Sequence, residues 1–247
     1  KGAKVGLITT KGFRDVLEIR TLRMPRLYDI AWEKPPPLVE RYLRRVVDER
    51  IDGRGRVERP LDLAAAEHEV EHLLRERVAA IAVCLLNSFA NPVHELEIKR
   101  IIERKAPGLP LSVSFEVLPE IKEYERTSTT VINAYVMPIV ATYLRALRKG
   151  LDQGGIPARL LLMQSNGGLT TDAAAVERPM NIIESGPAGG GGEASSARAS
   201  LHKPRASKKS SPSTWAAPRP KPRWSKARTS CARRSNLWAQ ASWRAPG

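Results

Sequence analysis

The sequence predicts an α/β protein whose mostly parallel sheet is covered by helices on both faces. Short apolar segments rich in β-branched residues recur along the first 190 residues, and segments with helical spacing of apolar residues separate them. Strands that are apolar throughout are typical of a sheet buried on both faces. With 247 residues, of which 42% are hydrophobic, the chain is long enough to bury a core.

Four segments are predicted as strands, because each is too short for a buried helix and is bounded by turn residues. They are VGLITT (5–10), AAIAVCLLNSF (79–89), LPLSVSFEVL (109–118) and RLLLMQSN (159–166). The segment VVDERIDGRGRVERPL (46–61) predicts a hairpin that turns at Asp52 and Gly53.

Helical spacing of apolar residues predicts two helices between these strands, at 61–78 and 91–105. The second opens with Asn91 as a candidate N-cap and Pro92 at the first helical position. A longer helix is expected from Arg126 to Gly150, with a bend near Pro138, and a subdomain boundary near residue 125. The buried face of the first helix is predicted to contain Leu63, Val70, Leu73 and Leu74.

The first helix also contains the pattern H-E-x-x-H from His68 to His72, in which two His residues one turn apart bind zinc. Both His residues project away from the predicted buried face, where a catalytic zinc would lack a shaped cleft. His94 and His202 are the only other His residues. A solvated helix face is therefore the favoured interpretation, and no metal site is predicted.

The basic charge of the chain is concentrated in its C-terminal tail. Although the net charge is +15, residues 191–247 contain 13 of the 41 Lys and Arg residues and one of the 26 acidic residues, so the preceding part is nearly neutral. The tail contains no Val, Ile, Phe or Tyr but four of the five Trp residues, a composition that predicts disorder. One interpretation is an arm that stacks on bases and follows phosphates.

The cellular setting is predicted to be the cytoplasm. Cys84 and Cys231 are the only Cys residues, and the sequence shows neither a signal-peptide pattern nor an apolar run expected to span a bilayer. No membrane partner is therefore expected. Because Lys1 opens the chain without a Met and a strand follows almost at once, we expect the N-terminus to be truncated.

Two Gly-containing segments are candidates for ligand binding. QSNGGL (164–169) follows a predicted strand, where open α/β sheets place ligands, although Asn-Gly is first of all a turn signal. ESGPAGGGG (184–192) either aims backbone N–H groups at an anion such as phosphate or is a flexible linker. Carboxylates and Arg126 in EIKEYERTSTT (120–130) are equally explained by an exposed helix start.

Taken in order, these segments resemble the A subunit of the hydantoinase/oxoprolinase family, which includes N-methylhydantoinase, 5-oxoprolinase, and the acetone and acetophenone carboxylases. The resemblance covers residues 1 to about 190. The matching segments are TTKGFRDVLEI (9–19), RPLD (59–62), SFANPVHE (88–95), VLPEIKEYERTSTTVINAYVMP (117–138), LLLMQSNGGL (160–169) and ESGPAGG (184–190).

The resemblance implies an actin-like, sugar-kinase-like (RNase H-like) ATPase fold, here incomplete. It divides the chain into a part of the family's N-terminal region (1–125), the start of the ATPase domain (126–190) and the tail (191–247). It implies ATP and Mg²⁺ as cofactors, a B-type partner subunit and a small cyclic amide as substrate, opened after phosphorylation of the amide oxygen. In the carboxylase relatives a substrate enolate is phosphorylated instead.

The resemblance also implies site residues. The glycines Gly186, Gly189 and Gly190 are expected near the nucleotide. The cleft is expected to be lined by Gln164, Ser165, Asn166, Gly167 and Gly168, and shaped by Glu123, Glu125 and Arg126, while the catalytic residues are not identified. Two phosphate-binding hairpins of the family, Asp-x-Gly-Gly-Thr and Phe-Asp-Met-Gly-Gly-Thr, are not found in the chain, so it is expected to be inactive alone.

The second hairpin is expected where the chain has SPSTWAAPRPKPRWSK (211–226), which suggests that the tail is translated out of frame. Because Trp has the single codon TGG, a shift of one nucleotide turns Trp215–Ala216 into a Gly codon, and the surrounding residues permit Ile-Thr-Phe-Asp-Met-Gly-Gly-Thr. Three functions thus stand open: the enzyme, a nucleic-acid-binding protein that uses the tail, and a non-catalytic interaction subunit. The near-neutral body makes nucleic acid the less expected partner.

Overall fold

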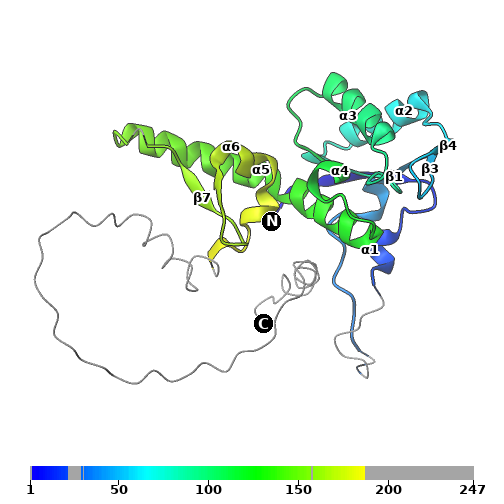
Figure 1. The fold of residues 1–247 in the computed structure, drawn as a ribbon, viewed down its shortest axis with the longest axis horizontal. Coiled ribbons are helices and arrows are strands. Elements are labelled where there is room, and N and C mark those ends of the chain that lie inside the picture. Colours follow the sequence, from blue (N-terminus) through cyan, green and yellow to red (C-terminus); the bar gives the residue numbers. More distant parts are fainter. Residues whose placement is uncertain (1, 22–28, 30, 157, 187–247) are drawn as a thin grey trace, which may run out of the picture. The chain divides into compact units, whose positions relative to one another are not determined.

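A four-stranded parallel sheet forms the centre of the first part of the chain (Figure 1). The computed structural model describes residues 2–21, 29, 31–156 and 158–186. The strand order is β2-β1-β5-β6, and each neighbouring pair is parallel. Every residue of β1 and β5 is buried, as expected for central strands covered on both faces. The strands are β1 (Val5–Thr10), β2 (Arg44–Val47), β5 (Ala80–Cys84) and β6 (Leu111–Val113).

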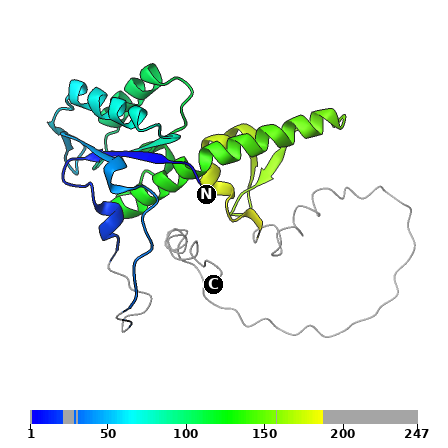
Figure 2. The ribbon, with the colours of Figure 1, turned by 180° about the vertical axis from the view of Figure 1, so that it is seen from behind.

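Helices cover both faces of this sheet. Helices α2 (Leu63–Arg75) and α3 (Val93–Lys105) lie on one face, and the first part of α5 (Glu123–Gln153) lies on the other, as both views show (Figures 1 and 2). The buried apolar side chains of β1, β5, α2 and α3 form one core cluster. The predicted α/β class with a parallel sheet is confirmed.

Helix α2 begins and packs nearly as predicted. The carboxylate of Asp62 caps it by accepting a hydrogen bond from the N–H of Ala65 at 3.1 Å. Ala66, Val70 and Leu73 are fully buried, but Leu63 is 50% exposed. The prediction that Leu63 belongs to the buried face is wrong, because at 100° per residue it lies at the margin of the narrow stripe formed by the other three.

The two hairpins lie outside the parallel sheet. The predicted turn at Asp52 joins β3 (Arg50–Ile51) to β4 (Val57–Arg59), and the Asp52 carboxylate accepts hydrogen bonds from the N–H groups of Arg54 and Arg56, both at 2.8 Å. A second antiparallel hairpin pairs β7 (Leu161–Met163) with β8 (Leu169–Thr171).

Three predicted strands end earlier than expected. The strand predicted at 79–89 ends at Cys84, the one predicted at 109–118 ends at Val113, where α4 (Ser114–Val117) begins, and the one predicted at 159–166 ends at Met163. In the first two cases an N–H group just after the strand, that of Leu85 or of Phe115, donates to the side chain of Glu95. A carboxylate from α3 thus ends both strands.

Helix α5 contradicts the expectation that no segment could span a bilayer. Within the described part of the chain it is the one helix that is long and apolar enough by length and composition, which is weak support for a membrane span because core helices pass the same test. Its first turns bury Arg126, Thr127, Thr130 and Asn133 against other elements of the protein. The apolar window of the helix is 28% buried, so only its first turns pack as part of the core.

The remaining elements are short: α1 (Val16–Ile19), η1 (Arg41–Leu43), α6 (Asp172–Glu177) and η2 (Pro179–Ile182). Residues Lys1–Ala188 form one compact unit. The predictions for residues 191–247, namely disorder, a nucleic-acid-binding arm and a shifted reading frame, lie outside the described residues.

Candidate functional site

Side chains fill the carboxyl edge of the parallel sheet, where open α/β sheets usually bind ligands. Glu49, which follows β2, is buried and accepts a hydrogen bond from the hydroxyl of Thr10 at the end of β1. Its other carboxylate oxygen lies 2.7 Å from Nδ1 of His94, in the first turn of α3. The Thr10 hydroxyl in turn accepts from the N–H of Leu86 at 2.9 Å. The polar groups here satisfy one another.

Glu95 joins the ends of two strands at the same edge. Its carboxylate accepts hydrogen bonds from the N–H of Leu85 at 2.8 Å, the hydroxyl of Ser114 at 2.7 Å and the N–H of Phe115 at 3.1 Å. Burial raises the pKa of the Glu95 carboxyl above its ordinary value, although these hydrogen bonds act in the opposite direction. Glu95 and His94 lie in the segment SFANPVHE, to which the structure gives a framework role.

Arg126 is a buried cation that contacts backbone carbonyls. Its guanidinium donates to the carbonyl of Leu85 at 2.7 Å and of Glu120 at 3.2 Å, and it lies over the Phe89 ring at 5.4 Å from the centroid. It is 1% exposed, and its Nε has no hydrogen-bond partner among the described residues. The hydrogen bond from Arg126 to Leu85 holds the start of α5 against the end of β5.

Glu123 and Glu125, the other two residues predicted to shape the cleft, are half-buried in the first turn of α5. Carboxylates are favourable at this end of a helix because of its macrodipole. Among the described residues, neither carboxylate forms a hydrogen bond or an ion pair with the Gly-containing segments. Their proposed role in the cleft stays a prediction.

The segment from Gln164 to Gly168 forms the turn between β7 and β8. The N–H of Gln164 donates to the carbonyl of Gly168 at 2.7 Å, and Gly167 adopts a φ of 87°, which favours glycine. The expectation that this segment lies at the ligand-binding end of an open parallel sheet is wrong, because its strands form a separate antiparallel hairpin. The simpler interpretation of Asn-Gly as a turn is confirmed.

Ser165 ties this turn to the start of the Gly-rich segment. Its N–H donates to the carbonyl of Asn181 at 2.7 Å, and its hydroxyl accepts from the N–H of Glu184 at 3.1 Å. The structure therefore brings two predicted site segments together, 164–168 and the start of 184–190. Gly186 is exposed with open space around its Cα, whereas Gly189 and Gly190 lie outside the described residues.

Most N–H groups of the hairpin turn are already engaged and cannot bind phosphate. Four N–H groups of the turn donate hydrogen bonds to acceptors within the protein, namely those of Gln164, Ser165, Gly167 and Gly168. Among the described residues of the Gly-rich segment, the N–H of Glu184 donates to the hydroxyl of Ser165, and the next two residues, Ser185 and Gly186, are helical. The hairpin turn therefore supports the first residue of the segment.

No metal centre is found in the part of the chain that the structure describes. There is no group of three or more His, Cys, Asp or Glu side chains that could hold a metal ion. His68 is 65% exposed, as the interpretation of a solvated helix face requires. His94 is held by Glu49 instead.

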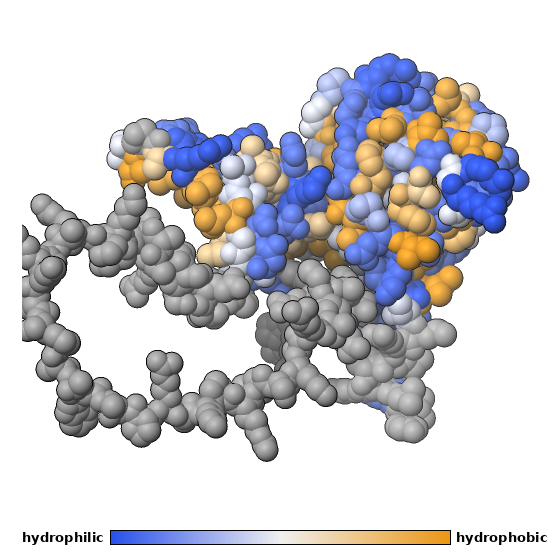
Figure 3. Space-filling model, viewed as in Figure 1, coloured by the Kyte–Doolittle hydropathy of each residue, from blue (hydrophilic) through white to orange (hydrophobic). Residues whose placement is uncertain are grey.

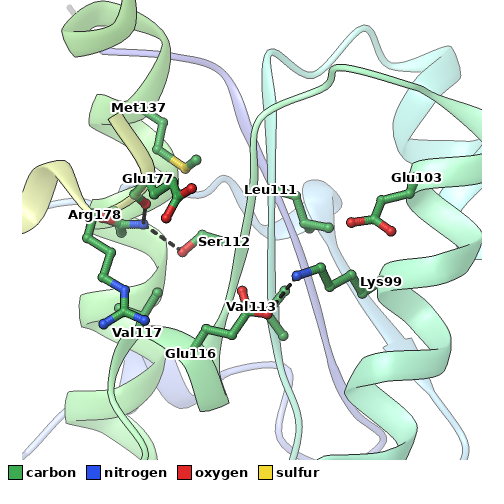
Figure 4. Close-up of a pocket in the computed structure, with 11 residues that line it drawn as sticks. Lys99, Glu103, Leu111, Ser112, Val113, Glu116, Val117, Met137, Glu177 and Arg178 are labelled. Atoms are coloured by element: carbon green, nitrogen blue, oxygen red, sulfur yellow. Dashed lines mark hydrogen bonds and ion pairs between the residues drawn. The ribbon is translucent and has the colours of Figure 1, made fainter. Parts of the chain in front are cut away.

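A pocket of about 430 Å³ lies at the open edge of β6 (Figure 4). Lys99 and Glu116 form an ion pair of 2.6 Å at one side, and the buried polar side chains Ser112 and Asn133 contribute to its wall. None of the residues predicted for the site lines it. Sequence reasoning missed Asn133, and the available signal was an amide in the interior of a helix, where it is a poor helix former.

Comparison with known protein families identifies two matching regions. Residues 1–106 match the hydantoinase/oxoprolinase N-terminal region, and residues 126–202 match the hydantoinase/oxoprolinase domain.

Several known proteins are similar to this chain. Caprolactamase subunit alpha of Pseudomonas jessenii is 36% identical over 189 residues, 76% of this chain and 27% of that subunit. The acetophenone carboxylase gamma subunit of Aromatoleum aromaticum is 34% identical over 181 residues, 68% of this chain and 25% of that subunit. 5-Oxoprolinase 1 of Arabidopsis thaliana is 28% identical over 209 residues, 77% of this chain and 16% of that protein. The chain thus spans about a quarter or less of these relatives.

Two solved structures are similar in fold. The ATP-dependent caprolactamase of P. jessenii superposes with a TM-score of 0.72 at 36% identity, over 76% of this chain and 28% of that chain. The nucleotide-free acetone carboxylase superposes with a TM-score of 0.69 at 27% identity, over 81% of this chain and 30% of that chain.

Proposed function

The chain belongs to the hydantoinase/oxoprolinase family, and from this premise we propose that it is part of an ATP-dependent enzyme that opens a cyclic amide. Its relatives include ATP-dependent enzymes, among them the caprolactamase of P. jessenii. The single observation that carries the proposal is the pairing of Ser165 with Glu184, which joins the first residue of the Gly-rich segment to the β7–β8 turn.

The proposed chemistry begins with transfer of the γ-phosphoryl group of ATP to the amide oxygen, which releases ADP. Water then attacks the activated carbon and the C–N bond breaks, giving a free amine and an acyl phosphate. A second water hydrolyses the acyl phosphate to a carboxylate and phosphate. Bound Mg²⁺ would neutralise charge that develops on the phosphates. In this chain the backbone N–H groups of Ser185 and Gly186 would face the phosphates, and the hairpin turn would hold the segment through Glu184.

The second candidate is an ATP-dependent ketone carboxylase of the same family. The similarity to the acetophenone carboxylase gamma subunit and to acetone carboxylase supports it. Both candidates share the transfer of phosphate from ATP to a substrate oxygen and differ in what attacks next. The slightly higher identity and TM-score of the caprolactamase favour the cyclic amide.

A separate B-type subunit is the proposed partner, and the cytoplasm is the proposed setting. The relatives named subunit alpha and subunit gamma support a multi-subunit enzyme. Exposed apolar side chains beyond the parallel sheet, visible as apolar surface in Figure 3, are typical of a surface that other protein covers. They include Ile139, Leu161, Leu169 and Ile183.

The test is a substrate panel assayed with the protein at its natural length, together with its partner subunits. We expect ADP to form in step with ring opening of caprolactam, 5-oxoproline or hydantoin, and no ATP use with acetone and bicarbonate. ATP use only with the ketone would support the second candidate. No ATP use with any of these compounds would reject both.

A further inference from the structure

Asn133 lies at the junction between the parallel sheet and the Gly-containing segments. Its side-chain N–H₂ donates to the hydroxyl of Ser112 in β6 and to the carbonyl of Glu177 at the end of α6, both at 3.2 Å. Its side-chain oxygen accepts from the N–H of Met180 in η2 at 3.3 Å. One buried amide therefore connects three elements.

The hydrogen bonds continue from η2 to the Gly-rich segment. The carbonyl of Asn181, the next residue after Met180, accepts from the N–H of Ser165, whose hydroxyl accepts from the N–H of Glu184. A continuous set of hydrogen bonds thus links strand β6 to the start of segment 184–190. We call this set the Asn133 relay; it comprises Ser112, Asn133, Glu177, Met180, Asn181, Ser165 and Glu184.

The chemistry of the site accounts for asparagine at this position. The side chain is 1% exposed in the interior of a helix, where a buried amide is costly unless its groups are paired. Both donor directions and the acceptor are used. An aspartate of the same shape would face the Glu177 carbonyl with an oxygen, and a leucine would pair with none of the three groups.

The hydrogen bonds of Asn133 lie beside the pocket. Ser112, Asn133, Glu177 and Arg178 all line it, and Figure 4 shows Ser112 and Glu177 on opposite sides of the dashed hydrogen bonds. Both α6 and η2 pack against α5. Across the pocket, the Asn133 amide bridges the end of α6 and β6.

We propose that Asn133 is the positioning residue that couples the parallel sheet to the nucleotide-binding Gly-rich segment, an inference that rests on the proposed function. It acts through η2 and Ser165 and touches no phosphate itself. Release of its amide would free residues 179–186 from the sheet while the core of the sheet stays folded. The N–H groups that follow Glu184 would then no longer be held for phosphate.

The test compares Asn133→Asp with Asn87→Asp in the protein at its natural length. Asn87 is a matched control because its side-chain N–H₂ also donates to a backbone carbonyl, that of Ile51 at 2.8 Å, but outside the relay. Hydrogen exchange of residues 164–168 and 179–186 should rise about tenfold in Asn133→Asp, the effect of losing one buried hydrogen bond. Exchange of β1 and β5 should not change.

The kinetic arm measures ATP dependence in the same variants. In Asn133→Asp the KM for ATP should rise about tenfold with a smaller change in kcat, and in Asn87→Asp the KM should stay near that of the unaltered protein. Ser112→Ala, which removes only the first hydrogen bond, should shift exchange and KM in the same direction by less. If Asn133→Asp does not fold, Ser112→Ala still tests whether the Asn133 relay couples the sheet to residues 179–186.

Unchanged exchange at residues 179–186, or an equal rise in KM in both Asn variants, would overturn the coupling. If the natural-length protein does not use ATP, the proposed function and the nucleotide part of this inference are wrong. The exchange arm would still decide whether Asn133 holds residues 179–186 to the sheet.

Discussion

Replacing Glu95 with alanine is expected to lower the free energy of unfolding by about 4 kcal/mol, because one buried N–H group, one partly buried N–H group and one buried hydroxyl lose their acceptor at ~1–3 kcal/mol each. The N–H groups are those of Leu85 and Phe115, and the hydroxyl is that of Ser114. No other described acceptor is recorded for the two N–H groups. Urea denaturation followed by circular dichroism measures the change.

The matched control is Glu97→Ala on the same helix. Glu97 pairs with Arg100 at 2.7 Å on the exposed surface, so its removal should cost less than about 0.5 kcal/mol. If Glu95→Ala proves no more destabilising than Glu97→Ala, the assignment of Glu95 as the common acceptor of both strand ends is wrong.

The same carboxyl predicts a pH dependence. Because burial raises its folded-state pKa above the ordinary value of 4.5, its contribution to stability is complete below that pH and is lost as the pH rises through the folded-state pKa. Glu95→Gln cannot titrate. The difference in unfolding free energy between the unaltered protein and Glu95→Gln should therefore move in favour of the variant as the pH rises from 4 to 8.

Replacing Arg126 with alanine is expected to lower the free energy of unfolding by about 3 kcal/mol, through a cavity and the loss of its hydrogen bonds to the carbonyls of Leu85 and Glu120. Arg126→Lys should also destabilise, because an ammonium cannot donate to both carbonyls and lie flat on the Phe89 ring. Thermal unfolding with a urea titration measures both variants.

Arg145→Ala is the control for the loss of an arginine from the same helix. Arg145 is exposed and bonds only to the carbonyl of Ala141 one turn before it, at 3.0 Å, so its removal should change stability by less than about 0.5 kcal/mol. Equal effects at positions 126 and 145 would mean that the Arg126 contacts do not hold α5 to the sheet.

Elements with local signals could be predicted from the sequence. β1 has the predicted bounds, since its continuous apolar run ends at the Lys11–Gly12 turn. Asp52 organises the predicted hairpin through contacts with residues two and four positions away. At α3 the helix begins at Val93 with Pro92 as N-cap, one residue later than predicted, and the side chain of Asn91 accepts from the N–H of Val93 at 3.1 Å. Each of these features depends on neighbours in the chain.

Features that depend on distant residues could not be predicted. The ends of β5 and β6 are set by Glu95, which lies ten and twenty residues from the N–H groups that it accepts. The contact of Ser165 with Glu184 spans 19 residues, and the contact of Asn133 with Met180 spans 47. No periodicity or turn signal encodes such pairs. The family resemblance supplied the segments, and only the structure supplied their contacts.

An open α/β sheet suggests a site at its carboxyl edge, but Glu49, His94 and Thr10 satisfy one another there. The hydrogen bond from the N–H of Glu184 to the hydroxyl of Ser165 instead supports our proposal that the nucleotide lies beside the β7–β8 turn. In this proposal the sheet edge is framework.

Hydrogen exchange of the natural-length protein with and without MgATP tests this placement most directly. The account predicts protection by MgATP in residues 164–168 and 184–190, with no change in residues 85–91 at the carboxyl edge of the sheet. Protection confined to residues 85–91, with none at 164–168 or 184–190, would contradict it.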